Sequence, residues 1–150
     1  MKRKLTPRAR HLSGILENYF IVPELVTQEL YGLMGPNAIC VFEEEILITL
    51  VQLRKHFKTP FIVNNWHLGG RFDGRGYRDY GETTGSNSSL HRLALAIDFM
   101  AVDIDAYTIR KEILENSEKF PYLRRLEKDV SWIHFDLKET YQKEIYSFKG

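Results

Sequence analysis

Three polar side chains, His91, Asp98 and His134, stand where the surrounding residues predict apolar β-strands. His91 precedes the apolar run Leu93–Phe99, Asp98 lies within that run, and His134 lies within residues 132–136. A buried carboxylate is costly unless it is paired or bound to a metal. Two imidazoles and one carboxylate, with one coordination position left open, are typical of a catalytic zinc site. These residues are therefore candidate ligands of one Zn²⁺ ion.

Spacing alone leaves a second interpretation open. A single histidine in a strand is more often a hydrogen-bonded core residue than a metal ligand, and the chain would then be an interaction domain without a metal. The one cysteine, Cys40, excludes an internal disulfide and a cysteine-rich zinc cluster. Any metal site must therefore use histidine and carboxylate side chains. The remaining histidines fit surface or helix-end positions: His11, His56 and His67.

The composition predicts a single globular domain over residues 1–150. Hydrophobic residues make up 43% and charged residues 27%, which excludes disordered and fibrous chains. The 21 basic and 20 acidic side chains give a net charge of +1, so the chain has no overall field for nucleic acid or anionic membranes. We expect neither as a partner, and we expect a monomer.

The N-terminus does not have the pattern of a signal peptide. The positive start Met1–Lys4 is followed at once by further charges instead of an apolar stretch. The longest apolar run elsewhere, Ile46–Val51, is far too short to span a membrane. The expected location of the protein as synthesised is the cytoplasm.

The first half of the chain predicts helices. Thr6 followed by Pro7 is a helix start, and Pro23 starts a second, short helix that ends at the connector Gly32–Pro36. The strongest helical pattern covers Phe42–Phe57, with acidic residues in its first turn and basic residues in its last.

The second half predicts strands with one intervening helix. That helix is capped by Asp103 or Asp105 and runs to Glu115, and the tail 138–150 adds an edge strand. The other expected strands are Phe61–Val63, Leu93–Phe99, Tyr122–Glu127 and Ser131–Leu137, the last two forming a hairpin. This order predicts an α+β fold in which N-terminal helices pack on one face of a small, mainly antiparallel sheet. The glycine-rich segment Asn64–Leu90 is expected to be a loop that borders the functional cleft.

Two segments of the sequence resemble the metal motifs of a known family. Ser89–Asp98 is similar to S-x-H-x-x-G-x-A-x-D, the first zinc motif of the zinc D-alanyl-D-alanine carboxypeptidases and L-alanyl-D-glutamate endopeptidases, which share their fold with the hedgehog signalling domain. Trp132–Asp136 resembles the second motif of the short phage and prophage branch, W-[IV]-H-[VIF]-D, about 40 residues further on. Weaker similarity extends over Phe20–Val26, Asn64–Trp66 and Gly76–Arg78.

This resemblance assigns roles to individual residues. It makes His91, Asp98 and His134 the zinc ligands and Ser89 the residue that orients the first histidine. It makes Arg78 the group that holds a substrate carboxylate or carbonyl. Arg71 and Arg75 in the same loop are alternatives to Arg78; Trp132 would form an apolar wall, and Asp136 would pair with a neighbour behind the site.

The function that the resemblance implies is zinc-dependent hydrolysis of peptidoglycan stem peptides, at a D-Ala-D-Ala or an L-Ala-D-Glu bond. A phage endolysin of this kind would reach the cell wall during lysis. The alternative is a non-catalytic peptidoglycan-binding or phage structural module of the same fold.

The chain departs from the family pattern at two positions. Ala94 stands where the motif has glycine, and Ser131 stands where many relatives have the glutamate that serves as general base. The base must then be Glu127 or Asp129. A hairpin loop over Lys128–Ser131 would set Glu127 opposite Trp132, on the face of His134, and Asp129 at the tip of the turn. Glu127 is therefore the preferred candidate.

Overall fold

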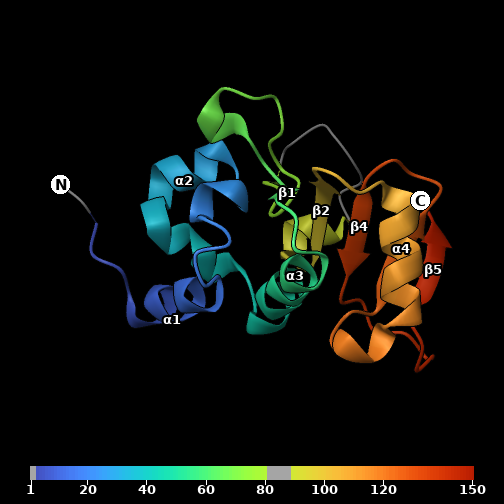
Figure 1. Ribbon diagram of the computed structural model, residues 1–150. Coiled ribbons are helices and arrows are strands. Elements are labelled where there is room, and N and C mark those ends of the chain that lie inside the picture. Colours follow the sequence, from blue (N-terminus) through green and yellow to red (C-terminus); the bar gives the residue numbers. More distant parts are fainter. Residues whose placement is uncertain (1–2, 81–88) are drawn as a thin grey trace.

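The computed structural model describes residues 3–80 and 89–150, and within them the chain has an α+β architecture (Figure 1). The α-helices of this part of the chain are α1 (Pro7–Ile15), α2 (Gln28–Met34), α3 (Glu44–Phe57) and α4 (Ala106–Glu115). None of its helices is long and apolar enough to cross a membrane.

Side-chain caps begin α1 and α4 where the sequence predicts them. Thr6 Oγ1 accepts a hydrogen bond from the backbone N–H of Ala9 at the start of α1, and Asp105 caps α4 through the N–H of Thr108. The predicted connector Gly32–Pro36 is wrong. Thr27 caps a new helix, α2, which runs through Gly32 and ends at Met34, before a 3₁₀ segment over Gly35–Val41.

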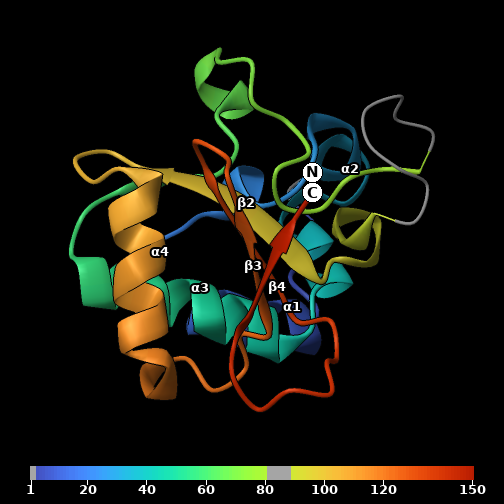
Figure 2. The same cartoon turned by 90° about the vertical axis from the view of Figure 1, so that its right-hand side faces the viewer.

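Five strands form one mixed sheet in the order β1-β2-β4-β3-β5. These strands are β1 (Phe61–Ile62), β2 (Ala96–Ala101), β3 (Arg125–Lys128), β4 (Ile133–Asp136) and β5 (Tyr146–Lys149). Figure 2 looks onto the sheet at strands β2, β3 and β4. The neighbouring pairs are antiparallel except β3 and β5, which are parallel. The expected edge strand in the tail is therefore present as β5.

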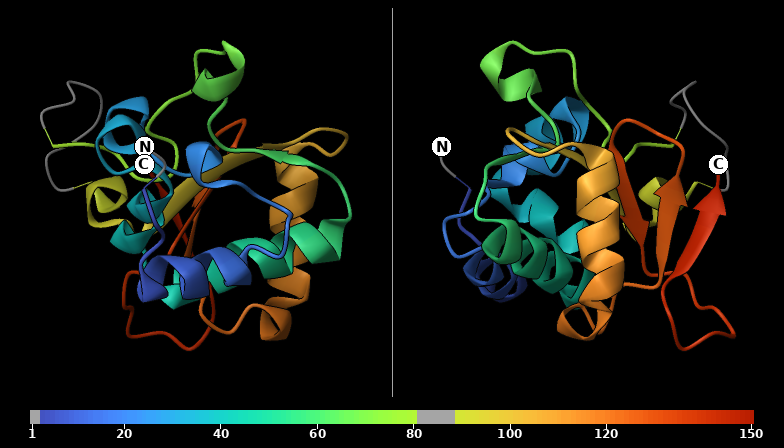
Figure 3. Two further views of the ribbon diagram at one scale, coloured as in Figure 1. Left: turned by 90° about the vertical axis from the view of Figure 1, so that its left-hand side faces the viewer. Right: turned by 45° about the vertical axis from the view of Figure 1, so that its right-hand side comes forward.

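Alternation along the strands separates an apolar face from a polar one. Ile97, Phe99, Ile133 and Phe135 are buried in the core together with the inward residues of α3 and α4. The helices lie on this side of the sheet (Figure 3). Residues two apart in a strand share a face, so Asp98, His134 and Asp136 lie together on the opposite face. The sheet thus builds a core on one side and displays the candidate ligands on the other.

The strand expected over Leu93–Phe99 begins three residues later, at Ala96. Leu90–Leu93 forms a 3₁₀ turn, and Ala94 ends that turn in the left-handed region with φ of 56°. His91 consequently lies on a turn beside β2, and the chain reverses at Ala94 before it enters the sheet.

Candidate metal centre

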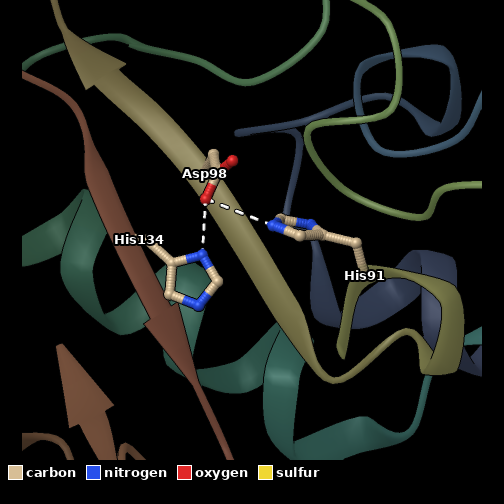
Figure 4. Close-up of side chains that lie close together, drawn as sticks. All are labelled: His91, Asp98 and His134. Carbon is tan, nitrogen blue, oxygen red and sulfur yellow. Dashed lines mark hydrogen bonds and ion pairs between the residues drawn. The ribbon is translucent and has the colours of Figure 1, made fainter. Parts of the chain in front are cut away.

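His91, Asp98 and His134 converge on one point, as the sequence predicts (Figure 4). Asp98 Oδ1 lies 3.3 Å from His91 Nε2 and 2.7 Å from His134 Nδ1. One potential ligand atom from each residue lies within 4.8 Å of the other two. Asp98 and His134 face each other directly in the β2–β4 register, whereas His91 reaches them from the 3₁₀ turn.

The backbone of the preceding loop orients the His91 ring. His91 is 4% exposed, and its Nδ1 lies 2.9 Å from the carbonyl oxygen of Gly76. When Nδ1–H donates to this carbonyl, Nε2 keeps its lone pair and faces Asp98. The resemblance assigns the role of orienting this ring to Ser89. The Ser89 hydroxyl instead accepts a 3.4 Å hydrogen bond from the backbone N–H of His91. The partner of the ring is Gly76, which the sequence analysis did not identify.

His134 presents the other ring nitrogen to the site. Its Nε2 lies 3.1 Å from Asp136 Oδ2, and its Nδ1 is directed to Asp98. Asp136 pairs with a neighbour, as the resemblance implies, but this partner, Arg125, lines the cleft instead of lying behind the site. The potential ligand atoms are therefore His91 Nε2, an Asp98 oxygen and His134 Nδ1.

Charges within the cluster shift the pKa values of its members. Burial alone would raise the pKa of Asp98, but the lowering effects of its neighbours, of which the hydrogen bond from His134 is the largest, outweigh burial and hold this pKa well below its usual range. Burial alone would lower the pKa of His134, but the bonds to Asp136 and Asp98 raise it to about 9. With this raised pKa His134 holds a proton at neutral pH, and a divalent cation that binds its ring would have to displace that proton.

The three candidate ligands open onto a cleft of about 610 Å³. Arg78, Glu127 and Trp132 also line it, together with Ser89. Within the described residues the glycine-rich loop therefore borders the site, as predicted, while residues 81–88 of that loop lie outside them. The cleft brings together a basic, an acidic and an aromatic side chain beside the cluster.

Backbone contacts fix Arg78 next to the first histidine. Its N–H donates to the carbonyl oxygen of His91 at 3.1 Å, and its Nε donates to the carbonyl oxygen of Gly74 at 3.3 Å. The alternatives Arg71 and Arg75 lie over the ring of Phe72 instead, 5.4 and 3.5 Å from its centroid. Neither is among the described residues that line the cleft.

Glu127 lies on the cleft face, but the hairpin register differs from the predicted one. Arg125 pairs with Asp136, so continuing this register sets Glu127 level with His134 instead of Trp132. The loop of the hairpin begins after Lys128. Arg110 of α4 holds this loop by donating to the carbonyls of residues 130 and 132. Side chains alternate between the two faces of a strand, so a register shift of two residues moves none of them to the other face. The predicted face of Glu127 is therefore unchanged.

Asp129 is the first residue after β3 and has a φ of 64°, which is compatible with the predicted turn. It borders a different hollow, between α4 and the β3–β4 loop, and is not among the described residues that line the cleft. Of the two candidate bases, the structure brings Glu127 alone to the cleft that holds the metal-ligand cluster.

Arg125 is a member of the site that the sequence analysis missed. It lies on the same face as Glu127, two residues away, and lines the cleft. The alternation that marked Glu127 also marks Arg125 as a charged residue next to the cluster, so the signal was present in the predicted strand.

Comparison of the chain with protein-family models, with curated proteins and with solved structures gave no match. Functional inference therefore depends on the geometry of the cluster, on the residues of the cleft and on the similarity of the two short motifs. The motif similarity concerns the segments that carry His91, Asp98 and His134, and the fold brings these segments together.

Proposed function

We propose that the protein is a zinc-dependent peptidase with a hedgehog/DD-peptidase-like fold that cleaves peptidoglycan stem peptides, as a carboxypeptidase or an endopeptidase of phage or prophage origin. One observation supports this most: His91, Asp98 and His134 meet in an open cleft from the positions that the two motifs mark. Two histidines and one carboxylate leave room for a substrate or water at the metal, as catalytic zinc sites do.

The chemistry divides among the side chains of the cleft. A divalent ion held by His91, Asp98 and His134 would supply Lewis-acid activation of water and of the scissile carbonyl. Glu127 accepts the proton of the attacking water as the C–O bond forms and passes it to the leaving amine, after which the C–N bond breaks. Arg78 pairs with a carboxylate or carbonyl of the peptide. The ring of Trp132 provides an apolar wall for the substrate.

A second candidate function is a peptidoglycan-binding or phage structural module that holds zinc without hydrolysis. The residue that favours it is Ser131, which stands three positions before His134 and is a poor proton acceptor. In this case Glu127 would shape the cleft but would transfer no proton.

Hydrolysis of purified peptidoglycan by the zinc-loaded protein tests the proposal. We expect new free amino groups, and defined D-Ala-D-Ala and L-Ala-D-Glu peptides will identify the bond. His134→Ala should abolish this release, whereas His11→Ala, at an exposed pair with Glu44, should leave it unchanged. Zinc binding without hydrolysis would favour the binding module, and absence of zinc binding would favour an interaction domain without a metal.

A further inference from the structure

Arg125 and Asp136 form an ion pair on the side of His134 that faces away from Asp98. Arg125 Nε lies 2.9 and 3.1 Å from the two carboxylate oxygens of Asp136, and Nη2 lies 2.7 Å from Oδ2. Asp136 is completely buried, and Arg125 reaches it because the two residues are directly opposite in the β3–β4 register. A planar guanidinium with two donors fixes both the position and the plane of the carboxylate.

The Asp136 carboxylate transmits this constraint to the imidazole of His134. Its Oδ2 lies 3.1 Å from His134 Nε2, while Oδ1 accepts the backbone N–H of Lys138 at 3.1 Å. An ionised carboxylate only accepts hydrogen bonds, so Nε2 must carry the proton. A neutral ring with its proton on Nε2 has its lone pair on Nδ1, the atom directed to Asp98.

The ring of Phe148, on β5, covers the ion pair. The guanidinium carbon of Arg125 lies 4.2 Å from the centroid of Phe148, and that centroid lies 5.7 Å from the centroid of His134. The Arg125 side chain is only 17% exposed. Exclusion of water strengthens hydrogen bonds to charged groups, so the pair holds its geometry more firmly than a surface ion pair would.

We propose that Arg125 and Asp136 are positioning residues that hold His134 with Nε2 protonated and Nδ1 toward the metal, and thereby raise the affinity of the site for a divalent ion. The inference rests on the metal site of the proposed function but not on hydrolysis. The backbone carbonyl of Gly76 orients the ring of His91 in the same way. Only the groups that orient His134 are side chains, so substitutions can remove them.

Zinc affinity is the first measurement. In Asp136→Asn the side chain keeps its size but can donate to Nε2, which permits the wrong tautomer of His134. We expect its dissociation constant for Zn²⁺, measured by competition with a chromophoric chelator, to rise about 10–100-fold. Arg125→Lys keeps the charge and loses the two-donor geometry, so a smaller rise is expected. Arg124→Lys is the control, because Arg124 donates to the carbonyl of Pro121, and its affinity should not change.

Ring ¹⁵N NMR of the zinc-loaded protein is the second measurement, because it reads the tautomer directly. We expect wild-type His134 to show a protonated Nε2 and a metal-bound Nδ1, and His91 to show the reverse arrangement. In Asp136→Asn the His134 signals should report a mixture of tautomers. A merely structural role would lower the melting temperature without moving either the dissociation constant or this pattern.

The outcomes separate this inference from the proposed function. Unchanged zinc affinity and an unchanged His134 pattern in folded Asp136→Asn would overturn it; if that variant does not fold, Arg125→Lys decides by the same two readouts. A wild-type protein that binds zinc but hydrolyses nothing would refute the peptidase and leave the positioning role standing. A wild-type protein that binds no zinc would overturn both.

Discussion

Glu127 is the residue that distinguishes a hydrolase from a metal-binding protein in the proposed function. It lies on the cleft face of β3, and its carboxylate lies so close to Gly150 that a side chain at position 150 would collide with it. The register of the hairpin sets it level with His134. In the proposed hydrolysis Glu127 is therefore the proton acceptor for the attacking water, since Ser131 is a poor proton acceptor.

Glu127→Gln should lower kcat by about 10²–10⁴-fold while zinc remains bound, because the amide keeps the shape of the side chain but accepts no proton. Turnover of a defined stem peptide, measured beside the zinc dissociation constant, checks this. Asp129→Asn is the matched control and should retain most of the activity, because Asp129 borders another hollow. Full activity in Glu127→Gln would place the base elsewhere.

The sequence predicts some residues of the site but not others. His91, Asp98 and His134 could be predicted because polar side chains in apolar strands need a partner. Arg125 carried the same alternation signal as Glu127 and was missed. The carbonyl of Gly76 could not be predicted, because every residue has a backbone carbonyl and only the folded loop brings this one to the His91 ring.

Helices and strands were predicted best where a local signal determines them. The Thr6 and Asp105 caps begin α1 and α4, and the stripe within Phe42–Phe57 corresponds to α3, which starts two residues later. The hairpin register differs from the predicted one by two residues, and the loop of the hairpin is held by Arg110 of α4, which is distant in sequence. The tertiary contacts that decide such features leave little trace in a local pattern.

The turn that carries His91 ends on an unfavourable residue. Ala94 has a φ of 56°, in the left-handed region that glycine adopts without cost. The motif that this segment resembles has glycine at the same position. The departure at Ala94 thus puts backbone strain next to the candidate ligand His91 while leaving the path of the turn intact.

Ala94→Gly should raise the free energy of unfolding by about 1 kcal/mol, because it removes the left-handed penalty of an L-residue. Chemical denaturation with unchanged m-values checks the gain. Ala96→Gly, at a buried position two residues later in β2, should instead destabilise the protein, since glycine is unfavourable within a strand. A loss of stability in Ala94→Gly would show that the methyl group contributes more by packing than it costs in strain.

At the scale of the whole molecule, the site is assembled from segments that are far apart in the sequence. Its groups come from the loop before residue 80, the turn over Leu90–Leu93, and strands β2, β3, β4 and β5. The order β1-β2-β4-β3-β5 and the parallel pairing of β5 follow from long-range contacts that no local pattern encodes. Because the candidate ligands meet only in the folded chain, we expect a bound metal ion to stabilise the fold.

Zinc should therefore stabilise the protein more at pH 8 than at pH 6. Without metal, the raised pKa of His134 stabilises the folded state fully below its ordinary value of 6.5, and this contribution is lost as the pH rises through about 9. Zinc must displace that proton, so binding weakens as the pH falls. At one hundred times its dissociation constant at pH 8, zinc should add about 2.7 kcal/mol, or roughly 5–10 °C in Tm.

Thermal unfolding at the two pH values, at one zinc concentration, checks this prediction. A chelator should reverse the gain, and His134→Ala should show a much smaller response to zinc. Equal stabilisation at pH 6 and pH 8 would mean that no proton leaves His134 when the metal binds.

The strand order also limits aggregation. The outer strands are short, two residues in β1 and four in β5, and β5 ends with Lys149. β1 pairs only with the last two residues of β2, Met100 and Ala101. Earlier along the same edge, the N–H of Asp98 donates to the carbonyl of Arg75 at 2.7 Å, so the loop before residue 80 covers this part of the edge. Open strand edges are templates on which another chain can add a strand, and short, charged or covered edges prevent this. The strand that carries Asp98 is thus shielded from intermolecular β-pairing without closing the cleft beside it.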